Sequence, residues 1–150
     1  ARPFRGSKGG IVTIQYLLDA NTLSEPVRGR PNRNVLRRMR HFEELIATAT
    51  VVWHELLYGC FRLPHSRRRH AIEQYLHERV RRTVQFLDYT AEAAAWHATE
   101  RARLELLGQD APFVDGQIAA TAKVNGLVLV TNNVRDFEHF DGLKIENWFR

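Results

Sequence analysis

The chain has 150 residues, which is enough for one compact domain but too short for two of ordinary size. No apolar run approaches the roughly 18 residues that a membrane-spanning helix needs, and the single cysteine, Cys60, excludes both an internal disulfide and a cysteine zinc cage. The net charge of +5 favours an anionic partner, and a lone thiol is typical of a reducing compartment, so we expect a cytoplasmic protein with no membrane contact.

The first ten residues are basic and contain glycine, but no apolar signal core follows them. We therefore expect residues 1–11 to be a disordered leader or a cloning remnant, and a single domain to occupy residues 12–150.

The first half of this domain alternates short apolar runs with amphipathic stretches. Thr50 has the position of an N-cap, and Pro64 ends the helix that follows it. In chain order, the patterns predict a strand at 14–18, a helix at 31–44, a strand at 45–49, and helices at 51–63 and 66–82.

The second half continues the alternation. Thr90 is a predicted N-cap, and Gly108 and Gly126 follow predicted helix ends. The patterns predict strands at 84–87, 127–130 and 143–146, and helices at 91–107 and 113–125.

Strands that alternate with helices imply right-handed crossovers. The expected fold class is therefore α/β, with a parallel sheet covered by helices on both faces. Ligands of such sheets bind at the carboxyl ends of the strands, near the point where the strand order reverses. That edge of the sheet is where we expect the chemistry.

Four acidic residues lie at or near the ends of the predicted strands. Asp19 directly follows the first strand, and Glu55 lies in the second turn of the helix that leaves the second strand. Asp115 lies near the start of the helix that leads into the fourth strand, and Asp136 lies six residues after that strand. If the first and fourth strands are neighbours, the four carboxylates converge on one small volume.

Several carboxylates close together raise one another's pKa unless a cation compensates their charge. A hard divalent ion such as Mg²⁺ or Mn²⁺ prefers oxygen ligands and can activate water for attack on a phosphodiester. The pattern therefore predicts hydrolytic cleavage of phosphodiesters. Each acid, taken singly, could also have an ordinary structural role. Asp19 and Asp115 could stabilise the N-termini of the helices in which or before which they lie. Glu55 could form an exposed ion pair, and Asp136 could be a turn residue.

Four segments resemble the motifs of PIN-domain nucleases, in the family's order. They are Tyr16-Leu-Leu-Asp-Ala-Asn-Thr-Leu-Ser24, Glu55-Leu-Leu-Tyr-Gly59, Asp115-Gly-Gln-Ile-Ala-Ala120 and Leu129-Val-Thr-Asn-Asn-Val-Arg-Asp-Phe137. The likeness runs from about Ile14 to Phe149. With the short length and the closing Ile145-Glu-Asn-Trp148, the chain is most similar to the VapC toxins of bacterial toxin–antitoxin pairs.

This resemblance implies a five-stranded parallel sheet of order 3-2-1-4-5 and one or two Mg²⁺ or Mn²⁺ ions. It implies endonucleolytic cleavage of RNA that inhibits translation and growth, a homodimer, and neutralisation by a cognate antitoxin. By position, the catalytic and metal-binding residues would be Asp19, Glu55, Asp115 and Asp136. Thr131 and Asn133 would support them through hydrogen bonds or bound water.

Basic residues cluster at 37–40, 62–70 and 79–82, where they could guide RNA phosphates or simply form solvated helix faces. His54, beside Glu55, points in a different direction on a helix, so we expect it to pack or to be solvated rather than to act as a base. We also expect Trp53, Trp96 and Trp148 to pack in the core or in a dimer rather than to stack on bases.

Three other functions compete with the RNA nuclease. A phosphatase of the haloacid dehalogenase type also places an Asp after the first strand, but it normally has a second Asp two residues later, where this chain has Asn21. A non-catalytic nucleic-acid-binding or scaffold domain would keep the fold, although all four carboxylates are present. A nuclease for structured DNA would need long insertions that this chain lacks.

Overall fold

The computed structural model describes residues 3–5 and 11–150 of the chain. The centre of the described part is a five-stranded parallel sheet of order β5-β4-β3-β6-β7. Counted along the chain from β3, this order is 3-2-1-4-5, so the expected sheet is confirmed. The strands are β3 (Tyr16–Leu18), β4 (Ile46–Ala49), β5 (Gln85–Leu87), β6 (Val128–Val130) and β7 (Ile145–Glu146).

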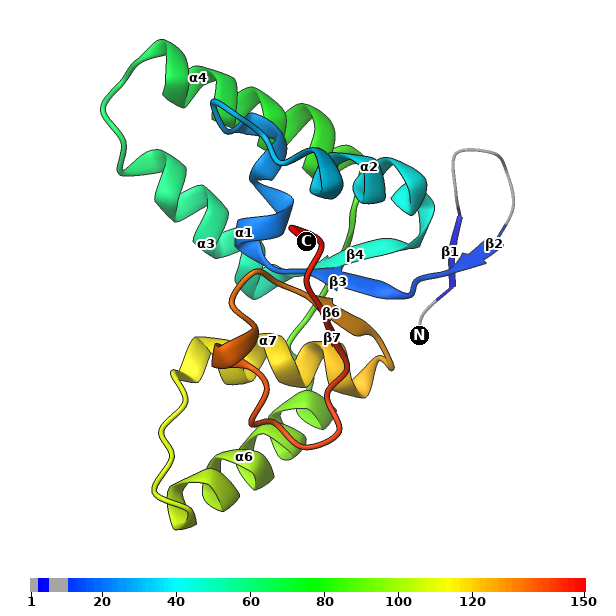
Figure 1. The fold of residues 1–150 in the computed structure, drawn as a ribbon, viewed down its shortest axis with the longest axis vertical. Helices are drawn as coiled ribbons and strands as arrows, with labels where there is room; N and C mark the ends of the chain where they lie inside the picture. The colour runs from blue at the N-terminus through cyan, green and yellow to red at the C-terminus, as the bar shows by residue number, and fades with distance from the viewer. Residues whose placement is uncertain (1–2, 6–10) are drawn as a thin grey trace.

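Helices cover both faces of this sheet, as the alternating pattern predicted. Figure 1 shows α2, α3 and α4 above the strands and the α6–α7 pair below them. The longer helices are α2 (Arg33–His41), α3 (Thr50–Phe61), α4 (Arg67–Gln74), α6 (Ala91–Leu106) and α7 (Phe113–Val124), and the short α1 (Ala20–Leu23) directly follows β3.

The basic stretch predicted as one helix over 66–82 is helical throughout, but its middle has π geometry. It consists of α4, the π-helix η3 (Tyr75–Val80) and α5 (Arg81–Thr83). Ser66 caps the start by accepting a hydrogen bond from the backbone N–H of Arg69. The remaining helical turns are the 3₁₀ segments η1 (Glu25–Val27), η2 (Glu43–Leu45) and η4 (Val134–Asp136).

Helix ends test the predicted capping residues. Thr90 caps α6 by accepting a hydrogen bond from the N–H of Ala93, as expected. The prediction that Thr50 caps α3 is wrong, because Thr50 is already the first helical residue and Ala49 takes the cap position without a side-chain bond. The physical reason is that β4 ends at Ala49 and leads straight into α3, which leaves no linker residue.

The C-terminal segment packs back onto the start of the domain. Trp148 is fully buried, and its ring lies 5.2 Å from that of Tyr16 and 5.7 Å from that of Phe42. Asn32, the N-cap of α2, donates a hydrogen bond to the carbonyl of Phe149. Trp148 is therefore a core residue, as expected, and the chain end helps to hold α2 on the sheet.

At the N-terminal end, β1 (Pro3–Arg5) pairs antiparallel with β2 (Ile11–Thr13). The other residues of the expected leader, 1–2 and 6–10, lie outside the described residues, so the boundary at residue 12 stays a prediction. In the part of the chain that the structure describes, no helix has the length and apolar character that a bilayer crossing requires.

Candidate active site

The strand order reverses at β3, which pairs with β4 on one side and with β6 on the other. β3 and β6 run in register, Leu17 opposite Leu129 and Leu18 opposite Val130. The first residue after β3 is Asp19, and its backbone N–H donates a hydrogen bond to the carbonyl of Val130. Asp19 therefore lies at the switch point, where parallel sheets bind their ligands.

Three hydrogen bonds hold the Asp19 carboxylate, which is only 6% exposed. The Thr131 hydroxyl donates to Oδ2 at 2.8 Å, the Asn21 amide donates to the same oxygen at 3.2 Å, and the backbone N–H of Ala20 donates to Oδ1 at 2.8 Å. These bonds fix the direction of the carboxylate. Oδ2 accepts two of these bonds and Oδ1 only one, so Oδ1 keeps an acceptor site that a ligand can use.

Asn21 ties the two strand ends together, a role that sequence reasoning missed. Its side-chain oxygen accepts a hydrogen bond from the backbone N–H of Asn132 at 2.9 Å, and its amide lies 3.3 Å from the Thr131 hydroxyl. The available signal was the polar residue two positions after Asp19.

The two predicted supporting residues lie beside Asp19, but they differ in how they contribute. Thr131 is fully buried and contacts the carboxylate directly. Asn133 is exposed, and its backbone N–H donates to the Thr131 hydroxyl at 3.1 Å. The role of the Asn133 side chain stays a prediction.

The other three acids come from separate elements on the same side of the molecule. Glu55 lies in the second turn of α3 and Asp115 in the first turn of α7, whereas Asp136 ends η4 and is exposed. Each element begins just after a strand or leads into one, which is why residues far apart in sequence face one another.

The electrostatics of the site indicate that these acids share one volume. Burial, and to a smaller extent the charges of Asp19 and Asp115, raise the pKa of Glu55 to about 7. Burial, followed by the charges of Asp136 and Asp19, raises the pKa of Asp115 to about 6. The pKa of Asp19 is raised by burial against the opposing effect of its hydrogen bonds, and the charge of Asp136 raises it further.

No basic side chain relieves this repulsion, since none of the four acids forms an ion pair with a residue that the structure describes. Within the described residues, no group of three or more His, Cys, Asp or Glu side chains is arranged to chelate a metal ion. Mg²⁺ does not require such a cage, because it usually keeps several waters and takes one or two carboxylates directly. The set of oxygen donors therefore fits a hydrated, hard divalent cation.

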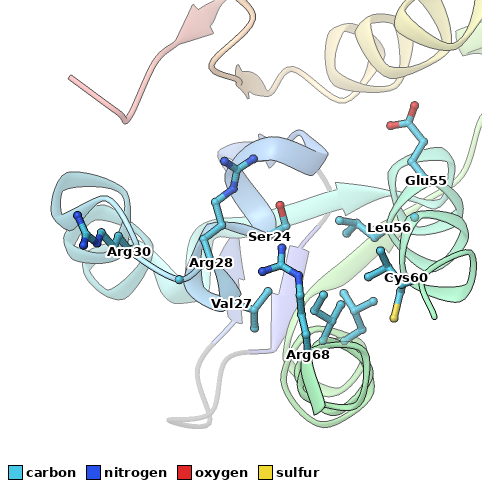
Figure 2. A pocket seen from close by; sticks show the side chains of 13 residues that line it. Ser24, Val27, Arg28, Arg30, Glu55, Leu56, Cys60 and Arg68 are labelled. Atoms are coloured by element: carbon cyan, nitrogen blue, oxygen red, sulfur yellow. The ribbon is translucent and has the colours of Figure 1, made fainter. Parts of the chain in front are cut away.

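A groove of about 570 Å³ adjoins the acidic cluster between η1 and the α3–α4 pair. Figure 2 shows Arg28 and Arg68 extending into the groove region, with Glu55 at its edge. Apolar side chains, among them Val27, Leu56, Leu63, Ile72 and Leu76, form much of its wall. The groove thus joins positive charge to an apolar surface beside the carboxylates.

His54 is exposed and stacks on Tyr58, with ring centroids 6.2 Å apart, so the expectation that it is solvated is confirmed. Trp53 packs against Phe86 and Trp96 against Phe140, which is core packing as expected.

Comparison with known proteins decides the family. The PIN domain family profile matches residues 16–143, which is most of the chain. The chain belongs to the PIN-domain family. The four motifs that resembled this family therefore reflect membership in it, and the parallel sheet of order 3-2-1-4-5 is its fold.

Several of the similar proteins are VapC ribonucleases. The chain is 30% identical to the tRNA(fMet)-specific endonuclease VapC of Shigella flexneri over 90% of this chain and 98% of that protein. It is 33% identical to Ribonuclease VapC2 of Haemophilus influenzae, with the same coverage. The DNA-bound VapBC structure from Salmonella typhimurium aligns with a TM-score of 0.79 at 29% identity, over 91% of this chain and 99% of that one. This chain is thus an enzyme of the VapC type, a nuclease toxin of toxin–antitoxin systems.

Proposed function

We propose that this PIN-domain protein is a metal-dependent endoribonuclease whose active site is formed by Asp19, Glu55, Asp115 and Asp136. The observation that carries the proposal is the raised pKa of Asp19, Glu55 and Asp115, whose carboxylates interact with one another and with Asp136 and have no basic partner among the described residues. A cluster of uncompensated negative charge is unfavourable by itself, and perturbed groups of this kind are concentrated at functional sites.

The residues that would hold Mg²⁺ or Mn²⁺, as one or two ions, are the same four acids. Asp19 is the best-oriented ligand because hydrogen bonds from Thr131 and Asn21 fix its carboxylate. Asp136 is exposed and suits contact through bound water, with the Asn133 side chain as a further polar group nearby in sequence. When bound, such an ion supplies an activated water and neutralises charge on the phosphodiester.

The groove beside the site supports an RNA substrate. Arg28 and Arg68 line it, and guanidinium groups bind phosphate oxygens in a fork geometry. A strand of RNA whose backbone contacts these arginines would reach the edge of the acidic cluster at Glu55, which lines the same groove. Since the Shigella relative is named for cleavage of tRNA(fMet), that tRNA is the first substrate to test.

The same groove suits a cognate antitoxin, because an amphipathic helix can bury its apolar face against the apolar wall. Apolar side chains around the α6–α7 connection, such as Leu106, Leu107 and Phe113, are at least half exposed and offer a surface for a homodimer. The solved Salmonella structure is a toxin–antitoxin complex bound to DNA, which supports a protein partner of this kind. The buried free thiol of Cys60 suits the reducing cytoplasm.

The test is cleavage of labelled tRNA(fMet) and labelled total RNA with Mg²⁺, Mn²⁺ or EDTA, by the wild type, Asp19→Asn and Asp115→Asn. We expect cleavage by the wild type with metal and none in EDTA or in either variant. Equal cleavage in EDTA and in both variants would contradict the proposal, because the carboxylates would then have no part in the reaction. If the wild type cleaves DNA but not RNA in a metal-dependent reaction, the assignment of the active site stands and the substrate is DNA.

A further inference from the structure

His97 is a buried polar residue outside the acidic cluster, and sequence reasoning did not single it out. It lies in the middle of α6, on the face that packs against α7, and only 4% of it is exposed. A histidine this deeply buried in a contact between two helices needs a partner for its ring nitrogens. The partners found here connect it to the helix that carries Asp115.

The imidazole ring of His97 lies directly against the backbone of α7 at Gly116. A Cβ atom added at Gly116 would lie 2.0 Å from Nε2 and 2.5 Å from Cδ2 of that ring. These distances are far below any real contact, so the ring fills the space that a side chain at position 116 would need. Glycine at this position is therefore required by the close approach of His97 rather than by its backbone angles.

The first turn of α7 has a second contact with the same ring. The Phe113 ring centroid lies 4.8 Å from that of His97, and the Arg101 guanidinium lies over the Phe113 ring at 5.4 Å. Val114 and Asp115 are the two residues between Phe113 and Gly116. The backbone on both sides of Asp115 is thus held against α6.

A hydrogen bond fixes the orientation of the imidazole. Tyr89 shares a 2.8 Å hydrogen bond between its hydroxyl and Nδ1 of His97. Tyr89 lies two residues after the end of β5, so the bond links the ring to the loop at the carboxyl end of that strand. The ring is consequently tied both to the sheet and to α7.

We propose that His97 is a positioning residue for the active site: through Gly116 it sets the placement of the first turn of α7 and thereby aims the Asp115 carboxylate at Asp19 and Asp136. The inference rests on the proposed function, since it assigns a role toward the acidic cluster. Displacement of a reacting group by about 1 Å can reduce the rate by about 100-fold, so a small rotation of α7 is sufficient to matter.

The contact can be tested by a reciprocal pair of substitutions. Gly116→Ala places a methyl group where the ring lies, and His97→Ala removes the ring. We expect Gly116→Ala alone to reduce kcat by about 10- to 100-fold, with a smaller change in KM. We expect the double variant to recover at least about 5-fold over Gly116→Ala, because the added methyl group then occupies space that the ring has left.

Two further variants separate positioning from packing. Tyr89→Phe keeps the aromatic ring and loses only the hydrogen bond, so a smaller reduction in kcat is expected. Thr99→Ala, on the exposed side of α6, is the matched control and should leave cleavage unchanged. The second readout is the Mn²⁺ midpoint, the Mn²⁺ concentration that half-saturates the protein in an isothermal titration, and the melting temperature in EDTA is measured for every variant.

The proposal predicts that Gly116→Ala raises this Mn²⁺ midpoint at least about 5-fold and that the double variant lowers it again. Strictly additive effects of the two substitutions, or an unchanged Mn²⁺ midpoint and kcat in Gly116→Ala, would overturn the positioning role. A lower melting temperature in EDTA with normal kcat and Mn²⁺ midpoint would leave His97 as a packing residue only. A wild type that neither cleaves RNA nor gains stability from Mn²⁺ would overturn the proposed function, and the positioning role with it.

Discussion

Two carboxylates of this chain are almost equally buried, and their surroundings shift their pKa values in opposite directions. Glu100 on α6 is 5% exposed and Asp19 is 6% exposed. Glu100 accepts two hydrogen bonds from the Arg103 guanidinium, at 2.8 and 2.9 Å, and one from the backbone N–H of Asp141, which lower its pKa. Asp19 has hydrogen bonds but no cationic partner in the part of the chain that the structure describes, and burial raises its pKa.

The difference indicates what each region is for. The Glu100–Arg103 pair links α6 to the loop after η4, since Arg103 also donates to the carbonyl of His139. Its charges are compensated within the protein, as expected of a structural contact. No basic side chain among the described residues pairs with the acids around Asp19, and a bound cation would provide the missing compensation.

The largest expected effect is that of Asp19→Asn, which removes the central charge of the acidic cluster and keeps its shape. Cleavage of RNA should fall at least about 100-fold, because the best-oriented metal ligand is lost. The melting temperature in EDTA should stay the same or rise, since a buried charge without a cation is replaced by a neutral amide. A large drop in that melting temperature would place Asp19 with the structural carboxylates.

Glu100→Gln should change the melting temperature in EDTA in the opposite direction from Asp19→Asn. The substitution weakens a charge-assisted hydrogen-bonded pair and should lower the free energy of unfolding by about 1–3 kcal/mol. For a domain of this size that corresponds to a fall in melting temperature of roughly 3–10 °C, both in EDTA and with Mn²⁺. Glu105→Gln, an exposed acid on the same helix, is the control. A loss of stability seen only with Mn²⁺ would mean that Glu100 acts on the metal site.

Thr131→Val tests the hydrogen bond that orients Asp19 and lowers its pKa. Removal of a partner that orients a metal ligand typically costs about 10- to 100-fold in metal affinity or activity, so the Mn²⁺ midpoint should rise by about 10-fold. Isothermal titration with Mn²⁺ measures it. An unchanged affinity would mean that Asn21 and the Ala20 N–H suffice to orient Asp19.

The smallest effect concerns pH. Because the pKa of folded Glu55 is raised to about 7 from its ordinary 4.5, the metal-free protein should lose stability as pH rises from about 4.5 to 7. Glu100 has a lowered pKa, so its contribution to stability is present above 4.5, its ordinary pKa, and is lost at lower pH.

Melting temperatures of the metal-free protein from pH 2.5 to 8 check both windows. Glu55→Gln should reduce the loss of unfolding free energy between pH 4.5 and 7 by about 1 kcal/mol. This figure is reduced because the Glu55 side chain is partly exposed. Stabilisation by Mn²⁺ should increase from pH 5.5 to 8, as the carboxylates ionise. If the melting temperature of the wild type in EDTA does not fall between pH 5 and 7, the carboxylates do not raise one another's pKa as we infer.

Much of the fold and of the cluster follows from local patterns. The apolar runs at 14–18 and 127–130 predicted β3 and β6, and the position of Asp19 just after the first run predicted a site at the sheet edge. Capping at Thr50 was not predictable in the same way, because a local rule cannot tell whether a linker separates strand and helix.

By itself, the sequence determined the α/β class, the family through its four motifs, and which acids stand at element ends, because periodicity and motif spacing are local properties of the chain. Only the tertiary structure decided that Asn21 joins two strand ends and that His97 presses on Gly116. These contacts join residues 19 to 111 positions apart. They depend on how helices and strands pack, which involves shape and distance that no local pattern encodes.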